Sequence, residues 1–304
     1  MRRLYTYFAF MLLAAVAFSC KNSGENAGDA KNSATTEPAE EAFVLPEVDD
    51  VCSQMDDPSF KAFCYKHFDT DSDGKVSMAE AAAVDELVIE SPFASEEGPS
   101  RYEFDEPVHS LKGIEYFPNL YALVFDFHQV TSLDVRNNTQ LKYLHCSSNK
   151  IGTLDVSKNP LLRELVCYSC GLTGLDVSHN PELLILSCSD NEIPSINVTN
   201  CPKLTDLSCT TNKISTLDLS NNPVLERLHC GNNLLTSLDL SKNPELNLLF
   251  CEGNQLTSLD LSKNPKLEWV LCKRNNITSL DLSNNSKVTL ADVDKETELI
   301  GYNR

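Results

Sequence analysis

The twelve cysteines of this 304-residue chain are its most chemically versatile residues, since thiols can form disulfides, bind metals or act as nucleophiles. Seven of them recur with a period of 21 residues, which predicts one column of side chains on stacked structural units. Parallel side chains on neighbouring strands lie about 4.8 Å apart, wider than the roughly 3.5–4.5 Å between the Cβ atoms of a disulfide. We therefore predict buried thiols that act as small apolar side chains. The column consists of Cys146, Cys167, Cys188, Cys209, Cys230, Cys251 and Cys272.

Four further cysteines, apart from Cys20 near the N-terminus, need separate interpretations. Cys167 and Cys170 have the spacing of a CxxC redox or zinc motif, but the period already places Cys167 in the column. Cys170 and Cys201 each fall at positions that asparagine occupies in other units, so the repeat explains them as well. Cys52 and Cys64 lie outside the repeats and form either one disulfide or two buried helix thiols.

Residues 69–80 form a second group with chemical potential, because aspartates alternate with small polar residues before a glycine and a later glutamate. The segment resembles the twelve-residue EF-hand calcium loop, including Gly74 at its sharp turn. The phenylalanine-containing segment before it and residues 81–89 after it are expected to form the two flanking helices. The resemblance implies side-chain oxygens from three aspartates, the carbonyl of Lys75, one oxygen or a bridging water at Ser77, and two oxygens from Glu80. The expected cofactor is therefore calcium, in a stabilising role. The alternative is an acidic turn without metal, because EF-hands usually occur in pairs. The predicted ligands are Asp69, Asp71, Asp73, Lys75, Ser77 and Glu80.

The N-terminus has the pattern of an export signal, with a basic start, an apolar run over residues 4–18, and Ser19 directly before Cys20. Residues 17–20 resemble the lipobox of bacterial lipoproteins, which implies that Cys20 is acylated and becomes the mature N-terminus. A soluble secreted product is the alternative. Residues 21–41 hold few apolar side chains and are expected to act as a flexible tether. The expected location is the bacterial cell envelope, with membrane contact only through the lipid.

The elements that position these residues come from a 21-residue repeat of the form LxxLxCxxNxIxxLDLSxNPx, with eight units over residues 120–287. This pattern resembles the leucine-rich-repeat family. The LxxLxC segment alternates as a strand does, and the LDLS segment supplies an opposite apolar wall. The predicted fold is a repeat solenoid with a parallel β-sheet on its concave face, a mostly irregular convex side and a small helical EF-hand-like cap.

Three polar columns accompany the apolar ones, and each receives a structural interpretation. Asparagines at the ninth position are expected to satisfy backbone groups of the turn after each strand. A second asparagine column precedes prolines such as Pro160, which break the strand and fix the corner. Aspartates such as Asp155 are expected to accept local backbone N–H groups, since one carboxylate per coil offers too few ligands for calcium.

The predicted organisation has five parts. Residues 1–19 are a signal peptide, and residues 20–45 carry the lipidated cysteine and the linker. Residues 46–119 form the helical cap, which includes an acidic insertion over residues 92–109 and a junction at residues 111–120 that resembles the lead-in to bacterial repeat arrays. Residues 120–287 are the repeats, and residues 288–304, where the pattern is lost, are expected to close the far end.

The net charge of −19 and the pI near 4.6 argue against nucleic acid or an anionic membrane surface as partner. Catalysis is not expected, because no motif brings a nucleophile, a base or a catalytic metal together. We predict a non-catalytic binding module for a protein or glycan ligand. The alternative is a structural or adhesion component of the envelope without a dedicated ligand.

The ligand surface is predicted on outward strand positions of the last repeats, where the third and fifth residues become apolar. An exposed aromatic cluster with a charged rim is typical of binding sites. The alternatives are that the C-terminal segment folds over this patch or that the protein dimerises through it; Tyr143 and Tyr168 form a second candidate surface. The predicted patch comprises Leu248, Phe250, Trp269, Leu271, Lys273 and Arg274.

Overall fold

The computed structural model describes residues 45–89 and 106–302, and these residues belong to one unit of the chain. The predicted signal peptide, the lipidation site at Cys20 and most of the acidic insertion lie outside the described residues. Within the described part, no helix is long and apolar enough to cross a membrane.

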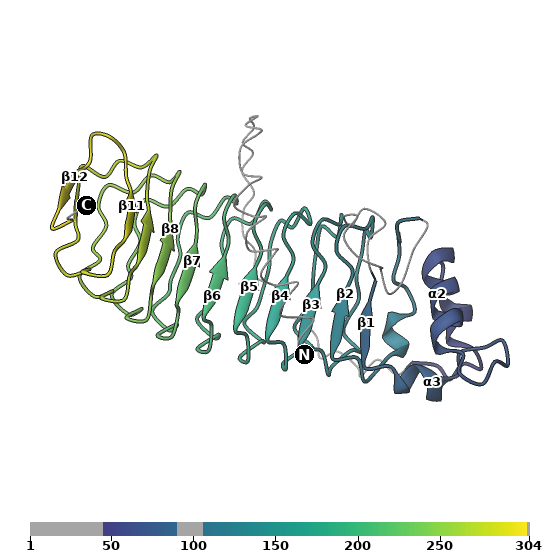
Figure 1. The fold of residues 1–304 in the computed structure, drawn as a ribbon. Helices are drawn as coiled ribbons and strands as arrows, with labels where there is room; N and C mark the ends of the chain where they lie inside the picture. The colour runs from purple at the N-terminus through teal and green to yellow at the C-terminus, as the bar shows by residue number, and fades with distance from the viewer. Residues whose placement is uncertain (1–44, 90–105, 303–304) are drawn as a thin grey trace, which may run out of the picture. The chain divides into compact units, whose positions relative to one another are not determined.

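The repeat produces one parallel sheet, in which each coil contributes a strand of three residues and pairs with the next coil in register (Figure 1). The fourth-position residue of each repeat points into the core, as Leu144 and Leu228 do at 0% exposure. The third and fifth positions point outward, and we call the side that they occupy the sheet face. The strands are, in spatial order, β1 (Glu86–Val88), β2 (Ala122–Val124), β3 (Tyr143–His145), β4 (Glu164–Val166), β5 (Ile185–Ser187), β6 (Asp206–Ser208), β7 (Arg227–His229), β8 (Leu248–Phe250), β9 (Trp269–Leu271) and β11 (Leu290–Asp292).

The opposite wall of the solenoid is built mainly from turns. The LDLS segments bury apolar side chains such as Val156 and Leu219 without forming a continuous sheet. At the last coil, β10 (Ser279–Asp281) and β12 (Glu298–Ile300) pair in parallel as a separate two-stranded sheet. The prediction of a leucine-rich-repeat solenoid with a parallel sheet and an irregular second side is therefore confirmed.

Both asparagine columns form hydrogen-bond ladders between coils. Asn149 donates through Nδ2 to the carbonyl of Phe125 at 3.0 Å and accepts the Val130 N–H at 3.0 Å, so it joins its own turn to the preceding coil. In the second column, the Nδ2 of Asn159 donates to the carbonyls of Val135 at 3.0 Å and Asn138 at 2.9 Å. The second column therefore contributes more than the proline corner that the sequence indicated, because each buried amide satisfies carbonyl groups of the coil before it.

The cap consists of short helices whose ends are fixed by polar side chains. Its 3-10 helices are η1 (Val51–Gln54) and η2 (Ile114–Tyr116), and its α-helices are α2 (Pro58–Phe68) and α3 (Met78–Ala83). The Asp57 carboxylate accepts the N–H of Phe60 at 2.9 Å at the start of α2. Ser77 and Glu80 form a reciprocal capping box at the start of α3.

The second helix of the cap is shorter than the sequence indicated. We expected residues 81–89 to continue as the helix that follows the acidic loop, and this prediction was wrong. Helix α3 ends at Ala83, and Glu86–Val88 form β1, which pairs in parallel with β2. The β-branched residues Val88 and Ile89 favour a strand, and the pairing covers the otherwise open edge of the sheet. The cap is thereby continuous with the solenoid.

A histidine makes the first rung of the ladder that joins the cap to the coils. His128 occupies the column position of Asn149 in the preceding repeat, and it is 4% exposed. Its Nδ1 accepts the Val108 N–H at 3.1 Å, and its Nε2 lies 3.3 Å from the Ile89 carbonyl. The backbone of the cap does not follow the regular path of a coil. A histidine replaces asparagine here because the larger imidazole reaches this backbone.

Candidate functional sites

The acidic loop brings three predicted ligands together. The carboxylates of Asp69, Asp71 and Asp73 each place an oxygen within 4.8 Å of the others. The N–H groups of Asp73 and Gly74 donate to the Asp69 carboxylate at 3.2 and 3.0 Å, which folds the loop around these oxygens. Gly74 has a φ of 85°, a conformation that residues with a Cβ rarely adopt. The loop therefore presents three hard oxygen donors on one side.

Glu80 closes the loop from its far end. Its Oε1 accepts from the Thr70 N–H at 2.6 Å, and its Oε2 accepts from the Ser77 N–H at 2.9 Å. These bonds, led by that from the Ser77 backbone, lower the pKa of Glu80 to about 2, so the carboxylate is ionised in all but strong acid. Glu80 is not one of the three carboxylates whose ligand atoms converge within 4.8 Å, and the Lys75 ammonium pairs with Asp49.

The loop is supported from behind by the start of η1. The Val76 carbonyl accepts the Val51 N–H at 2.8 Å, and the Val76 N–H donates to Asp50 Oδ1 at 3.1 Å. Asp50 Oδ2 also accepts from the Tyr65 hydroxyl at 2.6 Å, which links the loop to α2. The backbone of this single loop is thus paired with η1 and not with a second loop of the same kind. The donor set and this support fit a divalent cation that prefers oxygen ligands.

The cysteine column lies inside the solenoid. All seven members are buried, and none of the cysteines in the described residues is in a disulfide, including Cys52 and Cys64. Burial raises the pKa of Cys209 to about 12, so this thiol stays protonated at neutral pH. Cys170 takes the ladder position, where its Sγ lies 3.0 Å from the Cys146 carbonyl and replaces the asparagine donor. These observations confirm the prediction that the column consists of packed thiols.

The predicted apolar patch lies on the sheet face of the last coils. Leu248 and Trp269 are partners in register, as are Phe250 and Leu271, so the four side chains occupy adjacent positions on β8 and β9. Trp269 is 46% exposed. His229 on β7 packs against Phe250 with ring centroids 4.7 Å apart. The structure therefore brings the predicted apolar residues together.

The sheet continues past the last predicted repeat and extends the patch. Leu290 on β11 is the register partner of Trp269 and is 43% exposed. The C-terminal segment thus lies beside the patch as a further strand. Sequence reasoning missed Leu290, although it follows Trp269 by one period of 21 residues. The repeat pattern is weak in this last coil because Ala291 replaces the large apolar residue of the fourth position.

The charged rim of the patch is partly neutralised. The Lys273 ammonium pairs with the Asp292 carboxylate at 2.6 Å, and both side chains stay about half exposed. Arg274 has a φ of 58°, and its backbone N–H donates to Asp294 at 2.9 Å. Both cationic side chains are exposed at the turn after β9. The rim therefore combines a paired lysine with an exposed guanidinium.

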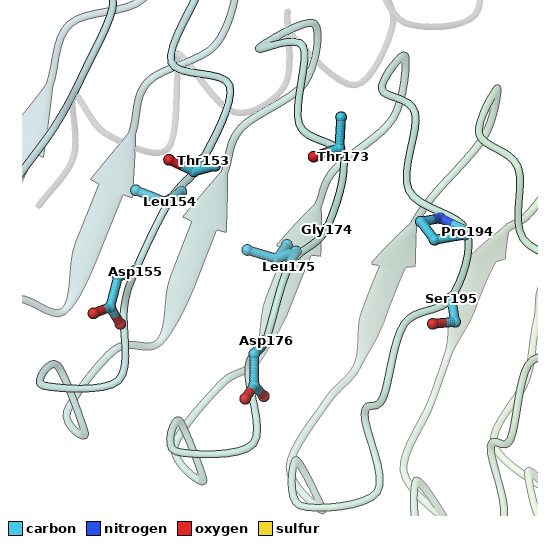
Figure 2. A pocket seen from close by; sticks show the side chains of 9 residues that line it. All are labelled: Thr153, Leu154, Asp155, Thr173, Gly174, Leu175, Asp176, Pro194 and Ser195. Carbon is cyan, nitrogen blue, oxygen red and sulfur yellow. The ribbon is translucent and has the colours of Figure 1, made fainter. Parts of the chain in front are cut away.

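A hollow of about 500 Å³ lies on the turn side of the solenoid, over three successive coils (Figure 2). It exists because Gly174 has no side chain at a position that Thr153 and Ser195 fill in the neighbouring coils. Asp155 and Asp176 line it, but each accepts a local N–H, from Ser157 at 2.9 Å and Ser178 at 2.8 Å. These turn bonds confirm the structural interpretation of the aspartate column. The hollow offers no convergent chemistry.

Comparison with known proteins supports the fold. No family model and no curated protein sequence matches the chain. Among solved structures, the functional domain of InlJ from Listeria monocytogenes, described as including a cysteine ladder, is similar at 28% identity and a TM-score of 0.61. That match covers 83% of this chain and 61% of the InlJ chain, so this protein spans about three fifths of its length.

Two further structures share the fold at lower identity. An internalin C2 from Listeria monocytogenes matches at 20% identity and a TM-score of 0.64, over 76% of this chain and 100% of the other. A leucine-rich-repeat protein from Leptospira interrogans, LIC12759, matches at 17% identity and a TM-score of 0.54, over 63% of this chain and 56% of the other. The chain is therefore a leucine-rich-repeat solenoid related in structure to bacterial internalins.

Proposed function

We propose that this chain is a non-catalytic lipoprotein of the bacterial cell envelope that binds a protein ligand through the apolar patch on β8, β9 and β11. Seven large apolar side chains are exposed among the described residues, and Trp269 and Leu290 are neighbours in register within the patch. This contiguous exposure is the observation that carries the proposal, because isolated exposed apolar residues are common whereas a cluster with a polar rim is typical of interfaces.

The composition of the patch favours a protein over a glycan. Leucines surround the single tryptophan, and aliphatic side chains offer little to the hydroxyl groups of a sugar. Tryptophan and arginine are enriched among residues that dominate protein interfaces, and Arg274 lies at the rim. The structural similarity to the functional domain of InlJ supports the repeat solenoid on which this surface is built.

The single tryptophan makes the patch directly observable. Protein and glycan arrays probed with the wild-type protein would supply ligands, and binding would shift the Trp269 emission to shorter wavelength as the indole loses water. A Phe250→Ala, Trp269→Ala double variant should bind about 30-fold more weakly, corresponding to about 2 kcal/mol. Leu234→Ala is the matched control, because Leu234 is 47% exposed but lies outside the patch. Unchanged affinity in a folded double variant would exclude this surface.

The proposal includes a calcium ion in the cap. Asp69, Asp71 and Asp73 would hold it, with the Lys75 carbonyl, Ser77 and Glu80 completing the set that the EF-hand resemblance implies. The converging aspartates support this assignment. An ion held there would tie α2 to α3, and its role would be to stabilise the cap that covers the first coil.

The proposal also includes acylation at Cys20, which rests on the leader sequence alone. Metabolic labelling with a fatty-acid probe should mark the wild-type protein and leave Cys20→Ala unlabelled. Equal labelling of the two proteins, or none in either, would contradict the lipid anchor. Protease treatment of intact cells would then distinguish a periplasmic from an external orientation.

A further inference from the structure

The first coils carry a second cluster on the sheet face, at the opposite end of the repeats from the apolar patch. We call it the polar cluster, and it consists of Asp126, His145, Ser147 and Glu164. These residues belong to three consecutive coils, at or just after β2, β3 and β4 (Figure 1). Glu164 and His145 occupy the outward third and fifth positions, which hold the uncharged residues Ile185 and Ser187 on β5. Asp126 and Ser147 lie at the seventh position of their repeats, so three ionisable side chains are concentrated on neighbouring coils.

The charged groups of the polar cluster are buried and lie close together. Asp126 and His145 are each 7% exposed, and the Glu164 side chain is 15% exposed. The His145 Nε2 lies 3.8 Å from the Glu164 Oε2. Burial raises the pKa of Asp126, and the neighbouring His145 charge opposes that increase. The polar cluster thus places two carboxyl groups and one imidazole together in a buried position on neighbouring coils.

The hydrogen-bonding capacity of the polar cluster is incompletely used. Asp126 Oδ1 accepts the Ser147 N–H at 2.6 Å. The Glu164 Oε2 and the Ser147 hydroxyl, by contrast, are buried and have no hydrogen-bond partner in the part of the chain that the structure describes. In that part, no lysine or arginine pairs with Asp126 or Glu164 either. A buried carboxylate oxygen without a donor is unfavourable, so a ligand with a charged donor would be stabilised here.

Aromatic side chains adjoin the polar cluster in sequence and in register. Phe127 and Tyr168 contact each other with ring centroids 6.3 Å apart, and Tyr121 and Tyr143 do the same at 6.3 Å. Tyr143 is the register partner of Glu164, which places one ring directly beside a carboxylate. Phe127 is 40% exposed and has a φ of 62°, a costly conformation for an aromatic residue. Ring faces attract cations, most strongly where water is excluded.

We propose that the polar cluster binds an organic cation, the guanidinium or ammonium group of an arginine or lysine side chain on a partner protein. Glu164 and Asp126 supply the opposing charge, the Ser147 hydroxyl accepts a hydrogen bond, and the rings of Tyr143 and Tyr168 flank the bound group. This site is separate from the apolar patch, so either can exist without the other. A partner that reaches both sites would present an apolar surface and a basic side chain.

The test uses small probes that carry only the proposed group. N-acetyl-arginine amide, N-acetyl-lysine amide and the uncharged isostere N-acetyl-citrulline amide are titrated into the full chain, and the imidazole signals of His145 are followed by NMR. We expect saturable shifts with a charged probe and none with citrulline. Glu164→Gln should weaken binding about ten-fold or more, because it removes one charge-assisted hydrogen bond. Glu226→Gln is the matched control, because Glu226 directly precedes β7 and lies outside the polar cluster; it should leave the affinity unchanged.

Each result decides the proposal. The stronger of the two charged probes identifies the side chain that the site prefers. Absence of saturable shifts with both, equal binding of citrulline, or unchanged affinity in Glu164→Gln would overturn the cation site. If Glu164→Gln fails to fold, Tyr168→Leu serves instead, with an expected loss of about five-fold from the missing ring. Equal probe affinity in a folded Tyr168→Leu protein would likewise overturn it.

Discussion

The cap and the coils of this protein satisfy the hydrogen bonds of their backbone groups in different ways. A coil is held by a small set of interactions that recurs in every unit, whereas the cap depends on contacts that occur once. The second asparagine column illustrates the first strategy, since Asn222 donates to the carbonyls of Val198 at 3.0 Å and Cys201 at 2.8 Å, and Asn243 repeats the same pair of bonds one coil later.

The cap relies on single carboxylates instead, of which Asp57 is buried and Asp50 is half-buried. Asp57 is 5% exposed; its Oδ1 begins α2, and its Oδ2 accepts the His109 N–H at 2.7 Å, 52 residues away. Asp50 binds the backbone of Cys52 and Val76 and the hydroxyl of Tyr65. In the part of the cap that the structure describes, neither set of contacts has a second copy that could replace it. Damage should therefore remain local in the coils, which contact only their neighbours, and should spread through the cap.

The largest expected effect is the loss of one buried leucine in a central coil. Leu207 is 1% exposed, and Leu207→Ala should lower the free energy of unfolding by about 3–4 kcal/mol, from lost apolar burial and the cavity left behind. Urea unfolding measures this change. Leu161→Ala, at an exposed leucine, should remain within about 0.5 kcal/mol of wild type.

The same variant tests whether coil damage stays local. Hydrogen exchange in Leu207→Ala should accelerate in the coils on either side of β6, while backbone amides of the cap keep their protection. Uniform loss of protection along the chain would show that cap and coils unfold as one unit, and the contrast between the two regions would then fail.

The repeats were predictable from the sequence because many columns carry the same information. The inward leucines, the cysteine column and the asparagine ladder each specify the coil independently, so a substitution such as Cys170 for asparagine does not obscure it. The aspartates of the acidic loop were predictable for a different reason, since their alternation around Gly74 forms a compact local pattern, and the structure brings Asp69, Asp71 and Asp73 together.

Features that depend on one tertiary contact were missed. The sequence of residues 84–89 does not predict that β1 pairs with β2, because a strand of three residues is too short to show an alternation of apolar and polar residues. His128 occupies a ladder position, but its partners at Ile89 and Val108 are set by the path of the cap. Leu290 was overlooked because the last coil retains the spacing of the repeat while its residues become smaller and more polar.

Calcium gives the second largest expected effect, and it acts on the cap alone. At a concentration 100 times its dissociation constant, calcium should add about 2.7 kcal/mol to the stability of the cap. The melting temperature should rise with calcium in the wild-type protein and in Leu207→Ala, but not in Asp71→Asn. The asparagine keeps the oxygen that accepts the Asp73 N–H, so this variant removes charge with little other change.

Glu80→Ala separates the metal from the local fold of the loop. It should abolish the calcium effect and also destabilise the metal-free protein at neutral pH, since Glu80 completes the capping box. The folded pKa of about 2 lies below the ordinary value of 4.5, so this contribution is present above pH 4.5 and is lost as the pH falls toward 2. Identical melting curves with calcium and with chelator in the wild type would refute the cap site.

The smallest expected effect is the difference in stability between two substitutions of one rung of the second ladder, and it tests whether the rung acts as a donor or as packing. Asn222 is fully buried, and Asn222→Ala leaves the carbonyls of Val198 and Cys201 without their donor, which should cost about 1–3 kcal/mol. The chain itself contains a milder replacement, because Cys201 occupies the same column and its Sγ lies 3.5 Å from the Val177 carbonyl. Asn222→Cys should therefore lose less stability than Asn222→Ala, since a thiol both fills the space and retains a weak donor. Urea unfolding of the two variants provides the comparison. If cysteine and alanine are equally destabilising, the ladder depends on the full amide geometry and the tolerance at Cys201 comes from its own surroundings. If both substitutions are neutral, the remaining rungs stabilise the coils without this one, which would strengthen the contrast with the cap.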